Sequence, residues 1–310
     1  MNIEIKVVDG KTTQIPLRLS DTNYFIDRRK NFNVLLIILA GYKPYLFEDV
    51  FARVKAFALK QFDICITSSG LFDETLNQIA AENDWSYLST AQNNIPLAQN
   101  LAIILHDKAE FIYKMDEDIF VTAGTFETLL KTYRHVLRYG HYNVGFVAPL
   151  IPINGYGHIR VLEKLGLLET YEKTFESTLY GTQPDRMIEK SPEVAKFFWG
   201  EGGFVPSIDD MNKTFQAQEI SYSICPVKFS IGLILFYRKI WEEMGGWQMP
   251  PPGYVGRGLD EDQICQFCVA GSLAMVVAEN SVVGHLSFRQ QNDAMKEYYL
   301  THREKFRCLI

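Results

Sequence analysis

Two aspartates stand two residues apart, directly after a strongly apolar segment. Asp116 and Asp118 follow residues 111–115, whose composition is typical of a buried strand. In an extended segment, side chains at positions i and i+2 point to the same side. Two carboxylates on one side suit a hard divalent cation, Mg²⁺ or Mn²⁺, that keeps open positions for phosphate oxygens. A solvated acidic turn is the alternative, but ligand sites in α/β sheets collect at the carboxyl ends of strands.

A second acidic group begins a later helical segment. Asp260, Glu261 and Asp262 follow a loop rich in Gly and Pro and precede apolar residues with helical character. A carboxylate at this place could act as a general base that takes a proton from a hydroxyl group. The alternative is charge placement alone, because acidic residues favour the first turn of a helix through the helix dipole.

Histidine and cysteine, the other common metal-binding residues, give weaker signals. His285 follows the apolar residues 282–284, so it is either a structural histidine or a third metal ligand at the end of a late strand. Cys265 and Cys268 form a CxxC pattern with no second pair and no His pair downstream. This pattern favours two thiols of a buried helix over a zinc site.

The elements that must position these residues alternate along the first 120 residues. The alternation predicts a parallel, doubly wound sheet with ligands at the carboxyl ends of its strands. Strands are predicted at residues 33–40, 62–67, 85–88 and 111–115, and helices at 46–60, 73–83 and 96–106.

The rest of the chain contains one long interruption. Residues 151–225 are rich in Gly and Pro and are interpreted as an insertion of loops and short helices, or a lid. Around this insertion, helices are predicted at 125–140, 238–244 and 260–270, and strands at 143–150, 228–237 and 273–277.

Composition excludes several classes of protein. The 310 residues are 47% hydrophobic and 22% charged, which is typical of a globular chain. With 31 basic and 37 acidic residues the net charge is −6, which argues against nucleic acid as the main partner. The sequence shows no signal peptide, and its longest apolar run, residues 34–40, is far shorter than the roughly 20 residues of a membrane span. Together with five scattered cysteines, these features predict a cytoplasmic protein, for which peripheral membrane contact stays open.

The motifs, taken in order, resemble the GT-A glycosyltransferases, especially the inverting enzymes of family 2. Residues 33–39 look like the first strand of that family, and residues 94–100 are similar to its Asn-x-Gly-x-x-x-Ala-Arg-Asn stretch. Asp116 and Asp118 match its Asp-x-Asp motif. Residues 245–262 are similar to its acceptor loop and acidic pair, and Gly271 and His285 fall where it often has a helix-ending Gly and a metal-binding His. The match covers residues 32–150 and 226–288.

The resemblance implies a fold and an activity. The expected fold is a single GT-A-like α/β domain over residues 1–310, with a Rossmann-like, mixed, mostly parallel sheet flanked by helices. Its parts are a nucleotide-sugar-binding half (32–150), the insertion or lid (151–225), an acceptor-binding and catalytic half (226–290) and a C-terminal helix (291–310). The implied activity is hexosyltransferase-like. A sugar moves from a nucleoside-diphosphate donor, a UDP-sugar by expectation, to a hydroxyl of a glycan, lipid-linked or protein acceptor.

The resemblance also implies site residues. Mn²⁺ or Mg²⁺ is expected on Asp116, Asp118 and His285. The catalytic carboxylate is expected among Asp260, Glu261 and Asp262, with Asp262 favoured. Contacts to the nucleotide sugar are expected from Ala40, Gly41, Tyr42, Ser69, Asp73, Asn100, Lys114, Asp116 and Glu117.

Departures from the family pattern leave alternatives open. Ser68-Ser69-Gly70 stands where the family has an Asp for the nucleotide base, so that Asp73 is the nearest carboxylate, and Gln99 stands in place of the Arg. A retaining enzyme of the same architecture would need no general base at Asp262. A sugar-1-phosphate nucleotidylyltransferase is disfavoured, because residues 40–44 are too short for its Gly-rich phosphate loop. A non-catalytic binding module is the remaining alternative.

Overall fold

The computed structural model describes residues 4–10, 22–216 and 219–308. The chain forms two compact units, each built from three stretches of sequence. Unit 1 comprises Met1–Tyr45, Leu59–Glu117 and Leu235–Phe267, and unit 2 comprises Leu46–Ala58, Asp118–Ile234 and Cys268–Ile310. The chain therefore passes from unit 1 to unit 2 within the Asp116-Glu117-Asp118 motif. The single domain and its internal boundaries at 32–150, 151–225, 226–290 and 291–310 stay predictions.

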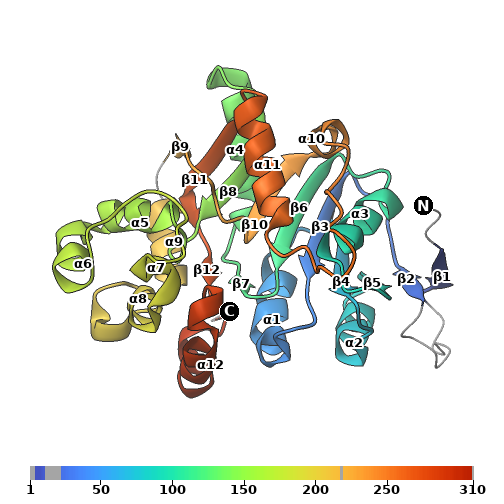
Figure 1. Cartoon of the computed structure of the whole chain (residues 1–310), viewed down its shortest axis with the longest axis horizontal. Helices are drawn as coiled ribbons and strands as arrows, with labels where there is room; N and C mark the ends of the chain where they lie inside the picture. Colours follow the sequence, from blue (N-terminus) through green and yellow to red (C-terminus); the bar gives the residue numbers. More distant parts are fainter. Residues whose placement is uncertain (1–3, 11–21, 217–218, 309–310) are drawn as a thin grey trace. The chain divides into compact units, whose positions relative to one another are not determined.

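Unit 1 contains a mostly parallel sheet, drawn in blue to teal in Figure 1. The strands run in the order β1-β2-β5-β4-β3-β6, and every neighbouring pair is parallel except β2 with β5. All residues of β4 and β5 are buried, as expected for strands covered on both faces. The bounds are β1 Ile5–Asp9, β2 Asn23–Asp27, β3 Val34–Leu39, β4 Asp63–Ser69, β5 Ser86–Thr90 and β6 Phe111–Asp116.

Polar side chains fix the starts of the two helices that contact this sheet. Helix α2 (Glu74–Glu82) begins after Asp73, whose carboxylate accepts a hydrogen bond from Leu76 N. Helix α3 (Ile95–Leu105) begins after Asn94, whose side-chain oxygen accepts from Leu97 N. Each cap satisfies a backbone donor that the first helical turn leaves open. The chain of unit 1 also forms α10 (Arg238–Glu243) and α11 (Leu259–Ala270), whose last three residues belong to unit 2.

Unit 2 is built around a second group of strands. Strand β11 (Ala274–Val282) is parallel to β8 (Val144–Leu150) and antiparallel to β9 (Tyr222–Ile224). Helices α4 (Thr125–Tyr139) and α9 (Ile208–Gln216) pack against β11. A separate two-stranded ladder pairs β7 (Ile119–Phe120) with β12 (Gly284–His285). Strand β10 (Leu233–Tyr237) carries the chain from unit 2 into unit 1.

One buried arginine joins three segments of unit 2. Arg53 in α1 (Phe47–Phe57) is fully buried, and its guanidinium forms an ion pair with Asp209 at 2.7 Å. The same group donates to the backbone oxygens of Phe306 and Arg307 near the end of the chain. This geometry uses the planar fork of donors that lysine lacks. The remaining helices of unit 2 are α5 Gly157–Leu165, α6 Leu168–Thr174, α7 Met187–Lys190, α8 Pro192–Phe198 and α12 Asn292–Thr301.

The structure confirms the mixed α/β class, with a mostly parallel sheet flanked by helices. The described residues between 151 and 221 form short helices and loops, as predicted, whereas Tyr222–Ile224 forms strand β9, which was not predicted. The strand predicted at 228–237 is too long, because only Leu233–Tyr237 is extended, and β11 reaches Val282 instead of ending at 277. Within the C-terminal segment predicted as a helix (291–310), α12 covers Asn292–Thr301 and a 3₁₀ turn follows at Arg303–Lys305.

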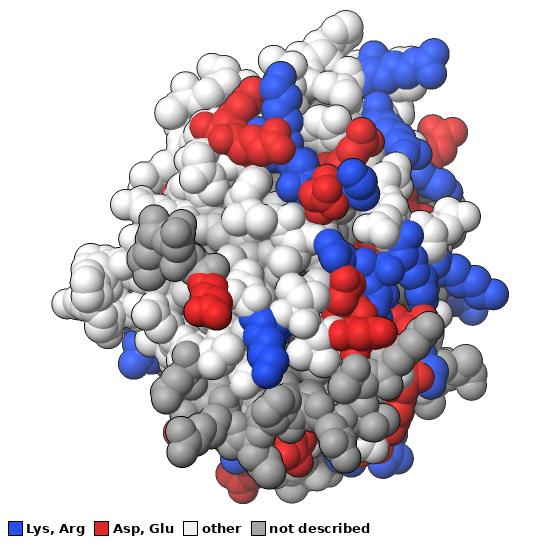
Figure 2. Space-filling model, turned by 90° about the vertical axis from the view of Figure 1, so that its right-hand side faces the viewer, with Lys and Arg blue, Asp and Glu red and all other residues white. Residues whose placement is uncertain are grey.

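Three features of the described residues bear on expectations from the composition: the surface charges, the apolar character of the helices and two cysteines. Figure 2 shows basic and acidic side chains side by side on the face that it presents. Within the described ranges, no helix combines the length and the apolar character that crossing a bilayer requires. Cys265 and Cys268 are buried thiols, as predicted.

Two buried histidines predict an acid-sensitive fold. Burial lowers the pKa of His106 in unit 1 and of His158 in unit 2 to about 4 each, although Nδ1 of each ring donates a hydrogen bond to a backbone carbonyl oxygen. The unfolded chain binds these protons near pH 6.5, so stability falls as the pH decreases from about 6.5 to about 4. Each histidine contributes a slope of up to about 1.4 kcal/mol per pH unit. Urea unfolding monitored across this range measures the slope.

The substitution His106→Phe tests the assignment. The ring of His106 packs edge-on against Phe25, so an aromatic replacement keeps the packing. We expect a shallower decline in stability towards pH 4 than in the wild type, whereas His141→Gln at an exposed position leaves the decline unchanged. An unchanged decline in His106→Phe would contradict the assignment.

Candidate functional site

A buried lysine pairs with two of the predicted site carboxylates in unit 1. Lys114 in β6 is 3% exposed, and its Nζ lies 2.8 Å from Asp116 Oδ1 and 3.7 Å from Asp260 Oδ2. Burial by itself would lower the pKa of Lys114, but the negative charges of Asp116 and Asp260 outweigh it and raise the pKa above its usual value. The lysine therefore stays charged and joins the end of β6 to the start of α11.

Asp260 is fixed from a second side. The amide Nε2 of Gln99 in α3 donates to Asp260 Oδ2 at 2.9 Å, and the carboxylate also accepts from Glu261 N. Asp260 is 5% exposed, whereas Glu261 and Asp262 are half-buried in the first turn of α11. The three acidic residues thus have different surroundings, and Asp260 is the one that holds the helix in place.

Glu117 shapes the turn after β3. Its carboxylate accepts hydrogen bonds from Gly41 N at 2.8 Å and from Tyr42 N at 3.1 Å. Gly41 has φ +137°, a backbone conformation that favours glycine. The hydroxyl of Tyr42 donates to Ser69 O at 2.6 Å, and so the turn is tied to the end of β4. Glu117 is a positioning residue for this turn.

Two of the predicted nucleotide contacts, Ala40 and Ser69, also lie at strand ends of unit 1. Ala40 N donates to Thr67 O, and Ser69 Oγ accepts from Asn94 N at 2.6 Å. A third predicted contact, Asp73, lies in the segment after β4 and is the N-cap residue of α2. Because β3, β4 and β6 are parallel neighbours, their carboxyl ends meet at one edge of the sheet, where open α/β sheets bind ligands.

Asn100 anchors the loop that precedes α11. Its side-chain oxygen accepts from Trp247 N at 2.8 Å and from Trp241 Nε1 at 2.9 Å, and its Nδ2 donates to Trp247 O. Gly246 approaches closely, because a Cβ there would lie 3.2 Å from Asn100 Oδ1. Trp247 is 2% exposed and packs edge-on against Phe236. Asn100 therefore determines the conformation of the loop.

Unit 2 brings Asp118 and His285 together. The Nε2 of His285 lies 3.6 Å from Asp118 Oδ2, a distance longer than a hydrogen bond. On the other side of the ring, Nδ1 lies 3.0 Å from Ile153 O. A carbonyl oxygen only accepts, so the network assigns the proton to Nδ1. Antiparallel pairing of β7 with β12 places His285 opposite Ile119, the residue that follows Asp118.

This pair fits a divalent cation. Metal-binding histidines commonly donate their other ring N–H to a carbonyl or carboxylate, as His285 does to Ile153 O. A carboxylate and a neutral imidazole nitrogen are also both ligands of Mn²⁺ and related ions. Among the residues that the structure describes, no three or more His, Cys, Asp or Glu side chains form a group able to hold a metal ion. The three-residue set Asp116, Asp118 and His285 stays a prediction.

Two contributors to the site have little or no signal in the sequence. Gln99 appears there only as a departure from the family pattern, although its amide holds Asp260. Ile153 contributes a backbone oxygen, which every residue type has, so no motif could indicate it. Its polar side chain, next to Asn100 in a helix whose other residues are apolar, was the one signal available for Gln99.

Comparisons with known proteins find similarity only among solved structures. No family model matches the sequence, and no curated protein matches it either. The structure of GalNAc-T7 with UDP, GalNAc and Mn²⁺ is similar over 84% of this chain and 44% of that chain, with 13% identity and a TM-score of 0.46. The mannosyltransferase PcManGT from Pyrobaculum calidifontis, in complex with GDP-Man and Mn²⁺, is similar over 88% of this chain and 63% of that chain, with 13% identity and a TM-score of 0.48. The chain spans less than two thirds of the length of either protein.

The buried ion pairs of Lys114 predict a large stability effect. Lys114→Met removes the cation and leaves two carboxylates near each other, of which Asp260 is buried. Removing one partner of a buried ion pair typically costs about 3–5 kcal/mol, so we expect a decrease of that size in the free energy of unfolding. Urea unfolding at pH 7 measures it.

An exposed pair in the same unit provides the matched control. Lys108 and Asp107 are 3.3 Å apart with side chains 65% and 63% exposed, so Lys108→Met should cost less than about 1 kcal/mol. A decrease for Lys114→Met no larger than that for Lys108→Met would show that the buried pairs do not stabilise unit 1.

Proposed function

We propose that the chain is a metal-dependent glycosyltransferase that moves a sugar from a nucleoside diphosphate to a hydroxyl acceptor. The observation that carries the proposal is the arrangement of His285 against Asp118. With the proton on Nδ1, the lone pair of Nε2 lies on the same side as a carboxylate oxygen 3.6 Å away. In that state both atoms are hydrogen-bond acceptors, and a divalent cation between them would be a ligand partner of both.

The proposed metal site uses few protein ligands. Asp118 and His285 would hold the ion, and the Asp-x-Asp pattern adds Asp116 on sequence grounds. Mg²⁺ and similar ions often combine one or two carboxylates with phosphate oxygens of the substrate, which suits such a site. When bound, the ion would neutralise the charge that develops on a leaving diphosphate.

The strand ends of unit 1 support a nucleotide donor. Glu117 fixes the Gly41–Tyr42 turn, and Tyr42 connects that turn to Ser69. These residues lie at the edge of a parallel sheet where nucleotides are commonly bound. None of these residues selects one nucleobase over another. The family resemblance favours a UDP-sugar as the donor.

Asp262 is the proposed general base, with Glu261 as its neighbour in the same turn. Asp260 is unsuited to this role because Lys114 and Gln99 hold its carboxylate. In the proposed inverting reaction, the Asp262 carboxylate takes the proton of the acceptor hydroxyl. The acceptor oxygen forms the new bond to the anomeric carbon, and the bond to the nucleoside diphosphate breaks on the opposite face.

A nucleotide panel tests the donor site. We expect one of UDP, GDP, CDP and ADP to raise the melting temperature only when Mn²⁺ is present. At a hundred times its dissociation constant, a ligand adds about 2.7 kcal/mol of stability. Asp118→Asn should abolish the metal-dependent increase, since the amide loses the negative charge that holds the ion. Thermal-shift measurements on both proteins check this.

The control is Asp185→Asn, which alters an exposed carboxylate of unit 2 and should leave the increase unchanged. If none of the four nucleotides stabilises the folded wild type, the donor site is disproved. If Asp118→Asn responds like the wild type, the metal assignment is wrong even though a nucleotide binds.

The base assignment predicts a separation of binding from turnover. Once the nucleotide is known, Asp262→Asn should bind it as the wild type does while transfer, or slow hydrolysis of the donor sugar, falls by about 10²–10⁴-fold. Measuring nucleoside diphosphate release beside the thermal shift separates the two effects. Turnover within threefold of the wild type would remove Asp262 from the mechanism.

A further inference from the structure

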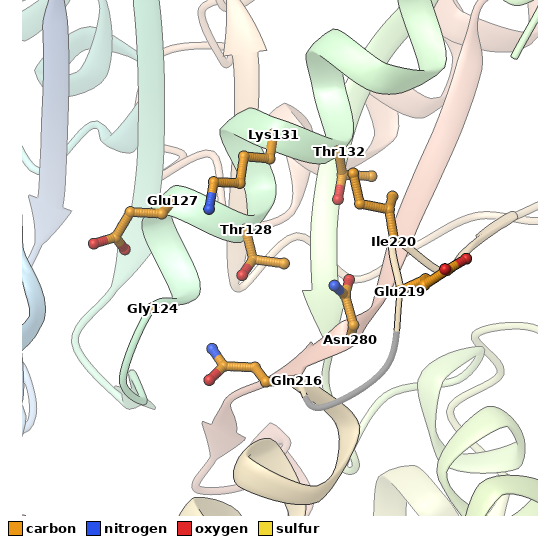
Figure 3. Close-up of a pocket in the computed structure, with 9 residues that line it drawn as sticks. All are labelled: Gly124, Glu127, Thr128, Lys131, Thr132, Gln216, Glu219, Ile220 and Asn280. Carbon is orange, nitrogen blue, oxygen red and sulfur yellow. The ribbon is translucent and has the colours of Figure 1, made fainter. Parts of the chain in front are cut away.

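Unit 2 contains a polar pocket that the proposed reaction does not use. Its volume is about 600 Å³, within the range of small-molecule sites. The lining side chains come from α4, the end of α9, the chain just before β9, and β11 (Figure 3). They are Gly124, Glu127, Thr128, Lys131, Thr132, Gln216, Glu219, Ile220 and Asn280. The pocket therefore shares no residue with the Asp118–His285 pair.

Three buried polar atoms of this lining have no hydrogen-bond partner among the described residues. They are Glu127 Oε2, Thr132 Oγ1 and Asn280 Oδ1. Thr132 is fully buried and Asn280 is 8% exposed. In native proteins buried polar atoms are almost always hydrogen-bonded, so three unsatisfied atoms around one pocket indicate a missing partner.

The lining is arranged as a binding surface. Figure 3 shows Thr128, Thr132, Gln216 and Asn280 projecting into the same space, whereas Glu219 points away from it. The amide of Gln216 donates to Ala123 O, which fixes its position at the edge of the pocket. A Cβ on Gly124 would lie 2.7 Å from this amide nitrogen, so a side chain there would displace the end of Gln216.

The chemistry of these atoms selects a class of ligand. The oxygens of Asn280 and Glu127 can only accept hydrogen bonds, so the ligand must supply donors. Since Glu219 points away from the pocket, the lining holds one carboxylate, of Glu127, and one ammonium, of Lys131. Equal and opposite charges favour neither an anion such as phosphate nor a cation. Hydroxyl groups, which donate and accept without charge, match both requirements.

We propose that this pocket binds a neutral, polyhydroxylated ligand, namely one pyranose unit of a glycan. Hydroxyl groups of the sugar donate to Thr132, Asn280 and Glu127, and they accept from Lys131. Ile220 supplies an apolar surface for the ring carbons. The proposal is independent of the glycosyltransferase assignment, because a sugar can bind here whether or not unit 1 binds a nucleotide.

The experiment uses the full chain without nucleotide or metal. Methyl glycosides of glucose, galactose, mannose and N-acetylglucosamine serve as probes in ligand-observed NMR titrations. We expect at least one probe to bind and its dissociation constant to rise at least tenfold in Thr132→Val and in Asn280→Leu. Thr132→Val keeps the shape of the side chain and removes an unpartnered hydroxyl, so its melting temperature should not fall. Thr214→Val, on the exposed surface of α9, is the control and should bind like the wild type.

Three outcomes would overturn the proposal. The first is that none of the four probes binds to the folded wild type. The second is that a probe binds but both pocket variants keep its affinity within twofold. The third is that inorganic phosphate binds and is lost in the same variants, which would show an anion site. None of these results affects the nucleotide panel, so the two proposals fail separately.

Discussion

Lys114 holds a positive charge in the interior of unit 1, where burial by itself would favour the neutral amine. The carboxylates of Asp116 and Asp260 reverse that preference and raise its pKa. Because Lys114 pairs with Asp116 in its own strand and also with Asp260 of α11, the end of the strand and the start of the helix are held together. Gln99 of α3 then orients Asp260. The positions of Glu261 and Asp262 in the first turn of α11 follow from these contacts.

The acidic residues that look equivalent in the sequence thus have separate tasks. Asp116 and Asp260 neutralise Lys114, and Glu117 holds the turn after β3 through two backbone N–H groups. Asp118 faces His285 in unit 2. A run of acidic residues such as Asp116-Glu117-Asp118 would repel itself if all three carboxylates shared one environment. Here each carboxylate has a different partner, so the run combines structural and chemical roles.

Much of this fold could be predicted from the sequence, because buried strands and amphipathic helices have distinct periodicities. The apolar run at residues 34–40 predicted β3, and the helices predicted at 73–83 and 96–106 correspond to α2 and α3. The strands β1 and β2 were not predicted. The residues of β1 are exposed or half-exposed, and this strand lacks an apolar run. Lys114 and Asp260 are separated by nearly half of the chain. The spacing of residues along the sequence cannot predict a contact over such a separation. The same holds for the hydrogen bond of His285 to a backbone oxygen.

The surroundings of the two aspartates of the motif also constrain how a metal would bind. Lys114 offsets the charge of Asp116, so this carboxylate attracts a cation less strongly than an unpaired one would. In the proposed site, Asp118 and His285 would then supply most of the protein's affinity, and two ligands would leave a divalent ion largely hydrated. A diphosphate contributes both negative charge and oxygen ligands, and it replaces those waters. In the proposed enzyme, metal and nucleotide should therefore bind as one cooperative unit, and the free ion should bind weakly. Such coupling keeps the site from retaining a metal when no donor is present.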